Sequence, residues 1–268
     1  MFFTQVLGSL AIAATMVAAA PTPVPEQPLL SERAAGTPST GVMTPAQCDA
    51  HKTRTTKGDP DKGFGISIKN ADTKARSFFV YSNGCEKTAY TQLADVGAGK
   101  TAFLSLPAKF QGRIQRGSAS VHMNKKEGTD TTLGTWLELG YDQDGKSVSY
   151  GDVSLIRGCD GGVTLSNTDG TKVSTGFSTN CVEGAPKAAL GKKLDGFASV
   201  LATEGFKKPG EPNPDQPKVI AAPRDWLLKK LTDKSGPAEK KAYIDDYHGN
   251  PVISDSKGRW QATFYKNP

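Results

Sequence analysis

The sequence predicts a mainly β protein whose central part is an antiparallel β-sandwich. Between residues 62 and 182, apolar side chains recur at every second position in short segments, a pattern typical of half-buried strands. Their apolar members are Phe64, Ile66 and Ile68; Phe78 and Val80; Leu137, Leu139 and Tyr141; Val153 and Leu155; Val163 and Leu165. Asn-Gly or Asp-Gly pairs follow several of these segments, and such pairs favour hairpin turns. Short strands with frequent turns favour a sandwich.

The first 20 residues are expected to form a cleavable secretory signal peptide. The run from Val6 to Ala20 is uncharged, almost wholly apolar or small, and ends in three alanines. Small residues at this point match a signal-peptide cleavage site, and the run is shorter than the ~20 apolar residues that span a bilayer. No later stretch is as long and apolar. We therefore expect a secreted, extracellular protein without a transmembrane segment.

Composition divides the rest of the chain into three parts. Residues 21–45 are rich in Pro, Ala, Ser and Thr, with few bulky side chains, so we expect them to be disordered. Residues 46–185 hold the predicted sandwich and are nearly balanced in charge, with 17 Lys and Arg against 15 Asp and Glu. Residues 186–268 hold 15 against 10, and are predicted to be a basic helical extension.

The extension is predicted to contain three helices and to end in a short hairpin. The helices are expected over residues 186–208, from Pro223 onward, and over 237–247, and the hairpin strands at 252–253 and 260–265. The residues with helical spacing are Leu190, Leu194, Phe197 and Leu201 in the first helix and Trp226, Leu227 and Leu231 in the second. Packing of the second apolar face against the sandwich is the expected role of its residues.

Four cysteines follow the predicted signal peptide: Cys48, Cys85, Cys159 and Cys181. An even number in an exported chain predicts two disulfides, with three possible pairings. We favour Cys48–Cys85 with Cys159–Cys181, because each bond then closes a short loop. The sequence has no Cys-x-x-Cys pair, and its three histidines are scattered. We therefore predict no metal and no cofactor.

One predicted hairpin, with strands over 135–141 and 149–156, carries two acids suited to chemistry. Its apolar residues should face the core, so alternation sends Glu138 and Asp152 to the opposite, open face. Two carboxyls on one face are what glycoside hydrolysis requires, one protonated to donate and one ionised. Outward-facing acids on a sheet are more often merely solvated, and both interpretations stay open.

The register of this hairpin decides whether the two carboxyls meet. An even loop pairs Glu138 with Gly151 and sends the two acids to different faces. A three-residue loop over 143–145 pairs Glu138 with Tyr150 and leaves Asp152 diagonal to Glu138. The apolar pattern favours the second register, with the carboxyls roughly 5–8 Å apart by the diagonal spacing of a sheet.

Four stretches of the predicted sandwich resemble, in order, segments of the thaumatin-like proteins. They are Phe78–Cys85, Phe110–Arg116, Leu137–Leu139 and Tyr150–Gly158. The second is similar to the family's Gly-Arg-Ile-Trp-x-Arg segment, one residue shorter and without the Trp. The last is the nearest match, to Tyr-Asp-Val-Ser-Leu-Val-Asp-Gly. The resemblance covers about residues 64–182.

The resemblance implies a flattened β-sandwich with an acidic cleft that bears an Arg, a Glu and several Asp. Such clefts are linked to β-1,3-glucan binding, weak glucanase activity and antifungal action. Position by position, Glu138 matches the cleft Glu and Asp152 its first Asp. The cleft Arg is matched by Arg113 or Arg116, ambiguously because of the missing residue.

The chain also departs from the family. Arg157 stands where the family has its second Asp, and would lower the pKa of neighbouring acids. The family has many more cysteines, so its disulfide-rich second domain is expected to be absent, with the helical extension in its place. Arg157 and Tyr150 complete the candidate substrate-binding residues.

Two functions are predicted. The first is a secreted monomer that binds cell-wall polysaccharide of the β-1,3-glucan class, with at most weak endo-glucanase-like hydrolysis by Glu138 and Asp152. The second is a non-enzymatic effector or antimicrobial protein whose basic residues 186–268 dock on a host or competitor surface. The incomplete acidic set favours binding over hydrolysis. The basic part lacks regular aromatic interleaving, so nucleic acid is not an expected partner.

Overall fold

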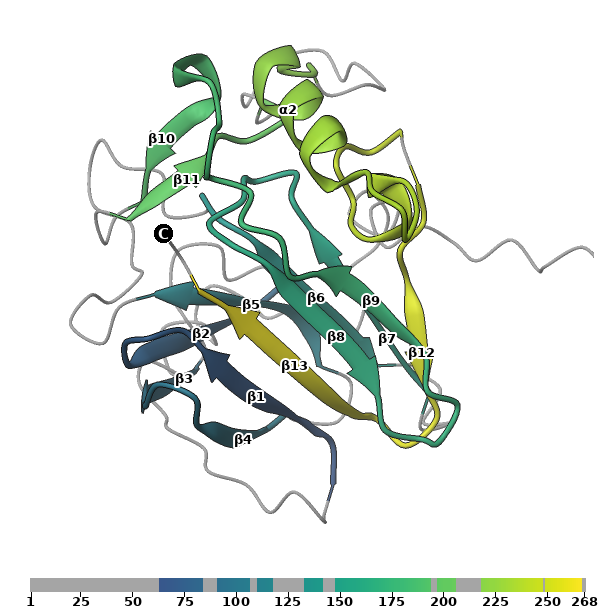
Figure 1. The fold of residues 1–268 in the computed structure, drawn as a ribbon. Helices are drawn as coiled ribbons and strands as arrows, with labels where there is room; N and C mark the ends of the chain where they lie inside the picture. The colour runs from purple at the N-terminus through teal and green to yellow at the C-terminus, as the bar shows by residue number, and fades with distance from the viewer. Residues whose placement is uncertain are drawn as a thin grey trace, which may run out of the picture. The chain divides into compact units, whose positions relative to one another are not determined.

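The computed structural model shows a mainly β protein with small helical elements. It describes residues 63–83, 91–106, 110–117, 133–141, 148–193, 197–205, 218–247 and 249–266. The predicted signal peptide, the predicted disordered segment, Cys48 and Cys85 lie outside the described residues. The described strands form sheets of five, six and two strands, and most neighbouring strands are antiparallel (Figure 1). The mainly β class predicted from the sequence is thereby confirmed.

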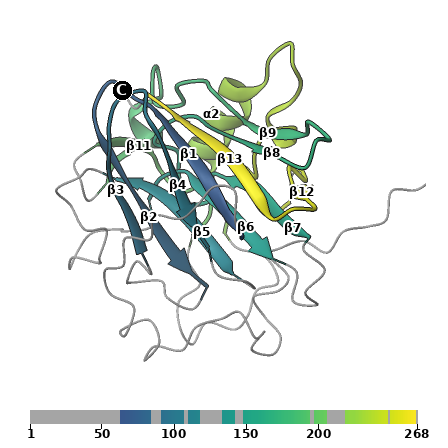
Figure 2. The same ribbon diagram turned by 90° about the horizontal axis from the view of Figure 1, so that it is seen from below.

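The five-stranded sheet has the chain's last described strand at its centre. In spatial order its strands are β4 (Thr101–Ser105), β1 (Gly65–Ala71), β13 (Arg259–Tyr265), β8 (Val163–Asn167) and β9 (Ser174–Phe177). β13 is parallel to β1 and antiparallel to β8, and the remaining pairs of this sheet are antiparallel. β1 and β13 run side by side in both views (Figures 1 and 2).

The six-stranded sheet is antiparallel throughout and carries the predicted acidic hairpin. In spatial order its strands are β12 (Ile253–Asp255), β7 (Ser149–Ser154), β6 (Trp136–Tyr141), β5 (Gln111–Gly117), β2 (Arg76–Ser82) and β3 (Thr91–Val96). The two-stranded sheet pairs β10 (Leu190–Lys192) with β11 (Ala198–Val200). The helical elements are the 3-10 helices η2 (Lys187–Ala189) and η3 (Ala238–Lys240) and the α-helix α2 (Ala221–Leu231).

Both large sheets contribute to one buried apolar cluster. The five-stranded sheet supplies Ile66, Ile68, Leu104, Val163, Leu165 and Phe264, and the six-stranded sheet supplies Phe78, Val80, Ile114, Leu137, Leu139 and Val153. These residues include most members of the period-two segments, so the prediction that these alternating positions face a core is confirmed.

The predicted C-terminal hairpin is wrong, because its two strands belong to different sheets. β12 pairs with β7, whereas β13 pairs with β1 and β8. On β13, Trp260, Ala262 and Phe264 alternate toward the buried cluster and are almost completely buried. An isolated two-stranded hairpin is only marginally stable in water, and burial of this apolar face favours the centre of a sheet. Residues within 186–268 therefore supply strands to both large sheets.

The predicted helix over residues 186–208 is also wrong where the structure describes it. This segment forms the single turn η2 and the paired strands β10 and β11. The backbone of Val200 also exchanges two hydrogen bonds with Cys159, at 2.8 and 3.1 Å. Gly191 lies so close to Leu201 that an added Cβ would meet the Leu201 side chain at 2.5 Å. Short apolar runs do not separate helix from strand by spacing alone, and here the tertiary pairing decides.

The helix predicted to begin at Pro223 is confirmed as α2, with Leu227 and Leu231 buried in the core cluster. The third predicted helix, over 237–247, is reduced to the one turn of η3. Among the described residues, none of the helices has the length and apolar character needed to cross a membrane.

A hydrogen bond joins α2 to a segment that a disulfide ties to the rest of the fold. Cys159 and Cys181 are bonded, which confirms this half of the favoured pairing. The Trp226 indole N–H donates to the Cys181 carbonyl oxygen at 2.7 Å. Trp226 and Leu231 therefore pack against the body of the protein, as expected for an amphipathic helix.

The central position of β13 makes Phe264 a sensitive site. Its ring lies 4.8 Å from that of Phe78 on the other large sheet, and it is fully buried. We predict that Phe264→Ala lowers the free energy of unfolding by about 3–5 kcal/mol, the cost of emptying such a site. Lys257→Ala, in the exposed turn before β13, should change it by less than about 0.5 kcal/mol. Urea denaturation checks both, and equal effects would contradict the central role of β13.

Candidate functional site

The outer face of the six-stranded sheet carries a continuous row of four polar or charged residues. In register, Tyr81 of β2 pairs with Arg113 of β5, Arg113 with Glu138 of β6, and Glu138 with Asp152 of β7. Directly opposite residues share a face, with Cβ atoms about 4.5–5.5 Å apart. We name this set the charged row. Its side chains point away from the apolar cluster because each alternates with a core residue of its strand.

The register differs from the predicted one, although the predicted face is right. Glu138 pairs directly with Asp152, whereas Tyr150 pairs with Gly140. The connection between β6 and β7 spans residues 142–148, so it is longer than the predicted three-residue loop. A shift of two residues keeps every side chain on its face. For this reason the apolar pattern does not distinguish the two registers.

The prediction that both acids lie on an open face is wrong for Asp152. Asp152 is fully buried and Arg113 is 2% exposed, whereas Glu138 keeps partial exposure. Aromatic rings enclose Arg113, whose guanidinium carbon lies 4.7 Å from the centre of the Tyr81 ring and 4.1 Å from that of Trp136. Such stacking helps to hold the cation in place.

A segment distant in sequence runs beside β7 at the end of this row. The Tyr243 N–H donates to the Val153 carbonyl at 2.9 Å, and the Leu155 N–H donates to the Tyr243 carbonyl at 2.8 Å. Tyr243 forms a bridge with Ser154, which lies on the same face as Asp152. Burial raises the pKa of the Tyr243 hydroxyl, and the nearby acids Asp152 and Glu138 shift it in the same direction.

Burial gives Asp152 an unusual protonation state. Neither of its carboxyl oxygens has a hydrogen-bond partner in the described part of the structure. Burial, and then the charge of Glu138, raise the pKa of Asp152 well above its ordinary range. Loss of solvation disfavours the charged form, and a like charge adds to that effect. Asp152 is therefore the carboxyl of the pair that holds a proton.

Glu138 is the more easily ionised member of the pair. Burial raises its pKa, but the opposing charge of Arg113 and a hydrogen bond from the Ser154 hydroxyl lower it. Asp246 raises the pKa of Glu138 and Arg157 lowers it. The pair thus resembles other carboxyl pairs in which different environments give the two acids different protonation states. Here Asp152 is the neutral acid, and the neighbouring Glu138 ionises next to Arg113.

The structure decides which of the two candidate arginines accompanies the acids. Arg116 points to the opposite face, where its guanidinium donates to the carbonyl oxygens of Asp160, at 2.8 Å, and of Tyr265. Its other partner is the Asp160 carboxylate, 3.5 Å away. Lys193 also donates to that carboxylate, at 2.6 Å. Burial opposes the ionisation of Asp160, but Lys193 and Arg116 outweigh it and hold its pKa below the ordinary range. Arg116 is therefore part of a structural network, and Arg113 belongs to the site.

Arg157 lies beside a second group of acids. Its guanidinium donates to the Glu204 carbonyl at 3.0 Å, and the Glu204 carboxylate accepts a hydrogen bond from the Asp246 N–H at 2.7 Å. Burial raises the pKa of Glu204 to about 7, with contributions of the same sign from Asp246 and Asp245. Arg157 thus lowers the pKa of both Glu138 and Glu204, the direction the sequence predicts for this residue.

Three partly exposed residues of the neighbouring strands β6 and β7 lie near one another on the outer face. Trp136 precedes Glu138 by two positions on β6, and Tyr150 lies opposite Gly140, two positions after Glu138. We name Trp136, Glu138 and Tyr150 the aromatic–carboxylate stripe. Its carboxylate lies beside the buried Asp152, with Trp136 toward one end of the strand pair and Tyr150 toward the other.

Sequence reasoning missed three contributors to this site: Tyr81, Trp136 and Tyr243. Trp136 has the same alternation phase as Glu138, and that signal was sufficient to place it on the outer face. Tyr81 has the phase opposite to Val80 and required the pairing of β2 with β5. Nothing in the local sequence places Tyr243 beside β7, because that contact joins distant segments.

No group of three or more His, Cys, Asp and Glu side chains within the described residues is arranged to hold a metal ion. A scan against models of known protein families finds no match to the chain, and a search of curated proteins finds none either.

The raised pKa of Asp152 predicts how stability changes with pH. A carboxyl with a raised pKa in the folded protein contributes most stability below its unfolded pKa of about 3.9, and this is lost as the pH rises through the folded pKa. We predict that Asp152→Asn removes this loss, so its free energy of unfolding falls less than that of wild type between about pH 5 and about pH 8. Urea denaturation across this range measures the difference. Asp225→Asn, at an exposed position, is the control, and an Asp152→Asn profile parallel to wild type would contradict the assignment.

Proposed function

We propose that the protein is a secreted thaumatin-like β-sandwich that binds a neutral cell-wall polysaccharide of the β-1,3-glucan class through the aromatic–carboxylate stripe. The observation that carries this proposal is the direct pairing of Glu138 with Asp152 between two partly exposed aromatic side chains. The signal-like first residues and the Cys159–Cys181 disulfide support an exported protein, because disulfides persist in oxidising compartments.

The chemistry of the stripe suits a sugar. Aromatic rings such as Trp136 and Tyr150 offer large apolar faces on which the C–H faces of a sugar ring can stack, and Tyr adds a polar hydroxyl. An ionised Glu138 accepts hydrogen bonds from sugar hydroxyls, and such charge-assisted bonds are stronger than neutral ones. Arg113 cannot move away from Glu138 without leaving its place between two rings. The Glu138 carboxylate is thus positioned to accept hydrogen bonds from a neutral ligand with many hydroxyl groups.

The burial of Asp152 favours binding over hydrolysis. Glycoside hydrolysis requires two carboxyls that both reach the scissile bond, about 5–5.5 Å apart in retaining enzymes and about 6.5–9.5 Å apart in inverting ones. Asp152 has no exposed surface, so it does not contact a sugar in this conformation. Its role in the proposal is to remain neutral and leave the charge on Glu138.

A pull-down with insoluble β-1,3-glucan tests this function. We predict that wild type is retained and that Glu138→Gln weakens binding by about 10-fold or more, in line with about 1.5–3 kcal/mol for a hydrogen bond to a charged group. Trp136→Ala should also weaken binding, because it removes a ring on which the sugar would stack. Glu183→Gln, which removes an exposed carboxylate elsewhere, should bind as wild type does. Circular dichroism confirms that the variants are folded.

Two results would overturn parts of the proposal. Failure of wild type to bind the glucan would remove the proposed ligand class. Release of reducing sugar by wild type, lost in Glu138→Gln and Asp152→Asn, would show that the protein hydrolyses the chain and that Asp152 becomes accessible.

A further inference from the structure

The second feature that points to a ligand is a concentration of positive charge around α2. Residues 218–241 contain seven Lys and Arg against three Asp and Glu, a net charge of +4 within a chain whose net charge is +6. The excess is therefore gathered in a short stretch of the chain. It lies on elements other than those that carry the aromatic–carboxylate stripe.

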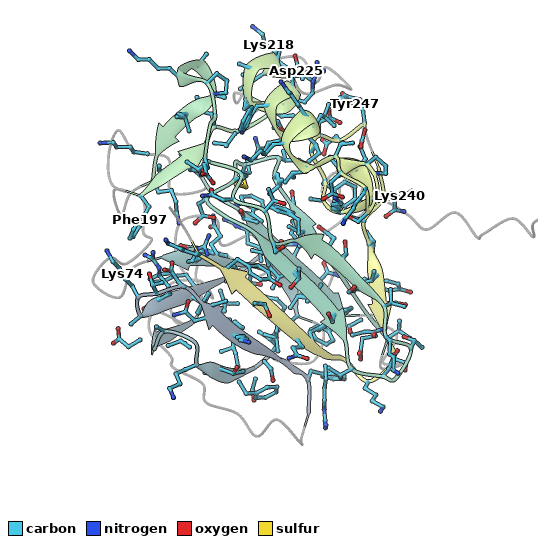
Figure 3. All side chains as sticks on the ribbon, viewed as in Figure 1. Lys74, Phe197, Lys218, Asp225, Lys240 and Tyr247 are labelled. Carbon is cyan, nitrogen blue, oxygen red and sulfur yellow. A yellow bond between two sulfur atoms is a disulfide. The ribbon has the colours of Figure 1, made fainter. Side chains whose placement is uncertain are left out.

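The fold extends this charge over neighbouring elements. Both 3-10 helices, η2 and η3, contact α2. They bring the exposed Lys187 and Lys240 next to the helix that carries Lys229. Figure 3 shows Lys218 and Lys240 on the segments that flank α2, at the periphery of the molecule. We name the exposed residues Lys187, Lys218, Lys229, Lys234 and Lys240 the basic surface.

Most acids of this region are already used by other cations. Asp225 pairs with Arg224 at 2.7 Å, and Asp233 pairs with Lys241 at 2.7 Å. The ammonium group of the partly exposed Lys230 donates to the Glu183 carbonyl oxygen at 2.9 Å and lies 5.4 Å from the Trp226 ring. The lysines of the basic surface make no ion pair among the described residues. Their charge is available to an external anion.

The apolar side of α2 is not available to a lipid bilayer. Leu227 and Leu231 are buried in the core, and Trp226 is bound to the Cys181 carbonyl. Of the large hydrophobic residues in the described range 218–241, only Ile220 is exposed. Helices that lie in a membrane interface insert an apolar face, and α2 has none to offer. The surface thus favours a polyanion in water.

The scarcity of available arginine in this region argues against a phosphate polymer as the ligand. The guanidinium of Arg224 is engaged by Asp225 through two of its nitrogens, at 2.9 and 2.7 Å. The remaining cations are lysines, which act as point charges without the fork geometry that arginine offers to phosphate. Dispersed lysines suit carboxylates spaced along a flexible chain. We propose that the basic surface binds a linear acidic polysaccharide whose charges are carboxylates, independently of the proposed glucan site.

Chromatography on immobilised polygalacturonate, with neutral dextran as the blank matrix, tests this inference. We expect wild type to be retained at low salt on polygalacturonate alone. The triple variant Lys229→Gln, Lys234→Gln and Lys240→Gln should bind more weakly, by about 10-fold or more. The magnitude of the slope of log affinity against log salt should fall by about two to three, as for counterion release on other polyanions.

The matched control removes three exposed lysines from another part of the fold. Lys69→Gln, Lys74→Gln and Lys100→Gln change the net charge equally, on β1 and in turns beside it. Equal loss of affinity in both triple variants would overturn the inference, because net charge alone would then explain binding. Absence of wild-type retention would also overturn it, as would equal or tighter binding to vesicles of anionic phospholipid.

The two proposals fail separately. Glu138→Gln should leave polygalacturonate binding unchanged. The triple variant of Lys229, Lys234 and Lys240 should leave binding to insoluble β-1,3-glucan unchanged. Loss of both activities in either variant would show that one surface serves both ligands, which contradicts the assignment of a separate basic surface.

Discussion

The fold depends on one long-range pairing, that of β13 with β1 and β8 in the middle of the five-stranded sheet. β13 is the last strand that the structure describes, so this sheet stays incomplete until the far end of the chain has paired in parallel with β1. The same segment reaches the six-stranded sheet through β12, which lies against β7. Because β7 carries Asp152, the candidate site depends on contacts made by the C-terminal segment. Residues 186–268, which composition sets apart as a basic extension, thus supply strands to both large sheets.

On the six-stranded sheet, burial gives Asp152 and Glu138 different protonation states. A buried carboxylate without hydrogen bonds costs free energy, and in the described structure Asp152 has no partner to offset that cost. The pair lowers the cost by keeping Asp152 neutral and placing the ionised carboxyl at Glu138, beside Arg113 and the Ser154 hydroxyl. The arrangement therefore does not stabilise the fold.

The sequence contained the local information of this fold but little of its long-range pairing. Alternation placed Leu137 and Val153 toward the core and Glu138 and Asp152 together on the other face, and this was confirmed. Register and burial were wrong, because a two-residue shift leaves the alternation unchanged and because the contacts that enclose the row come from distant segments such as the one around Tyr243. The first predicted helix failed for a related reason, since its apolar spacing also suits short strands that pair with each other. The resemblance to thaumatin-like proteins stays a prediction.

The two proposed surfaces have complementary ligand chemistry. The aromatic–carboxylate stripe offers rings and one anion to a neutral sugar chain, and it would repel a polyuronate. The basic surface offers dispersed cations, so it would bind an acidic chain in preference to a neutral one. Exposed lysines each contribute little and are screened by salt. In a wall that contains both polymers, however, attachment at one surface raises the effective concentration at the other, and two weak contacts then give firm retention. This would explain why a protein with a modest acidic site carries most of its net charge on a different part of its fold.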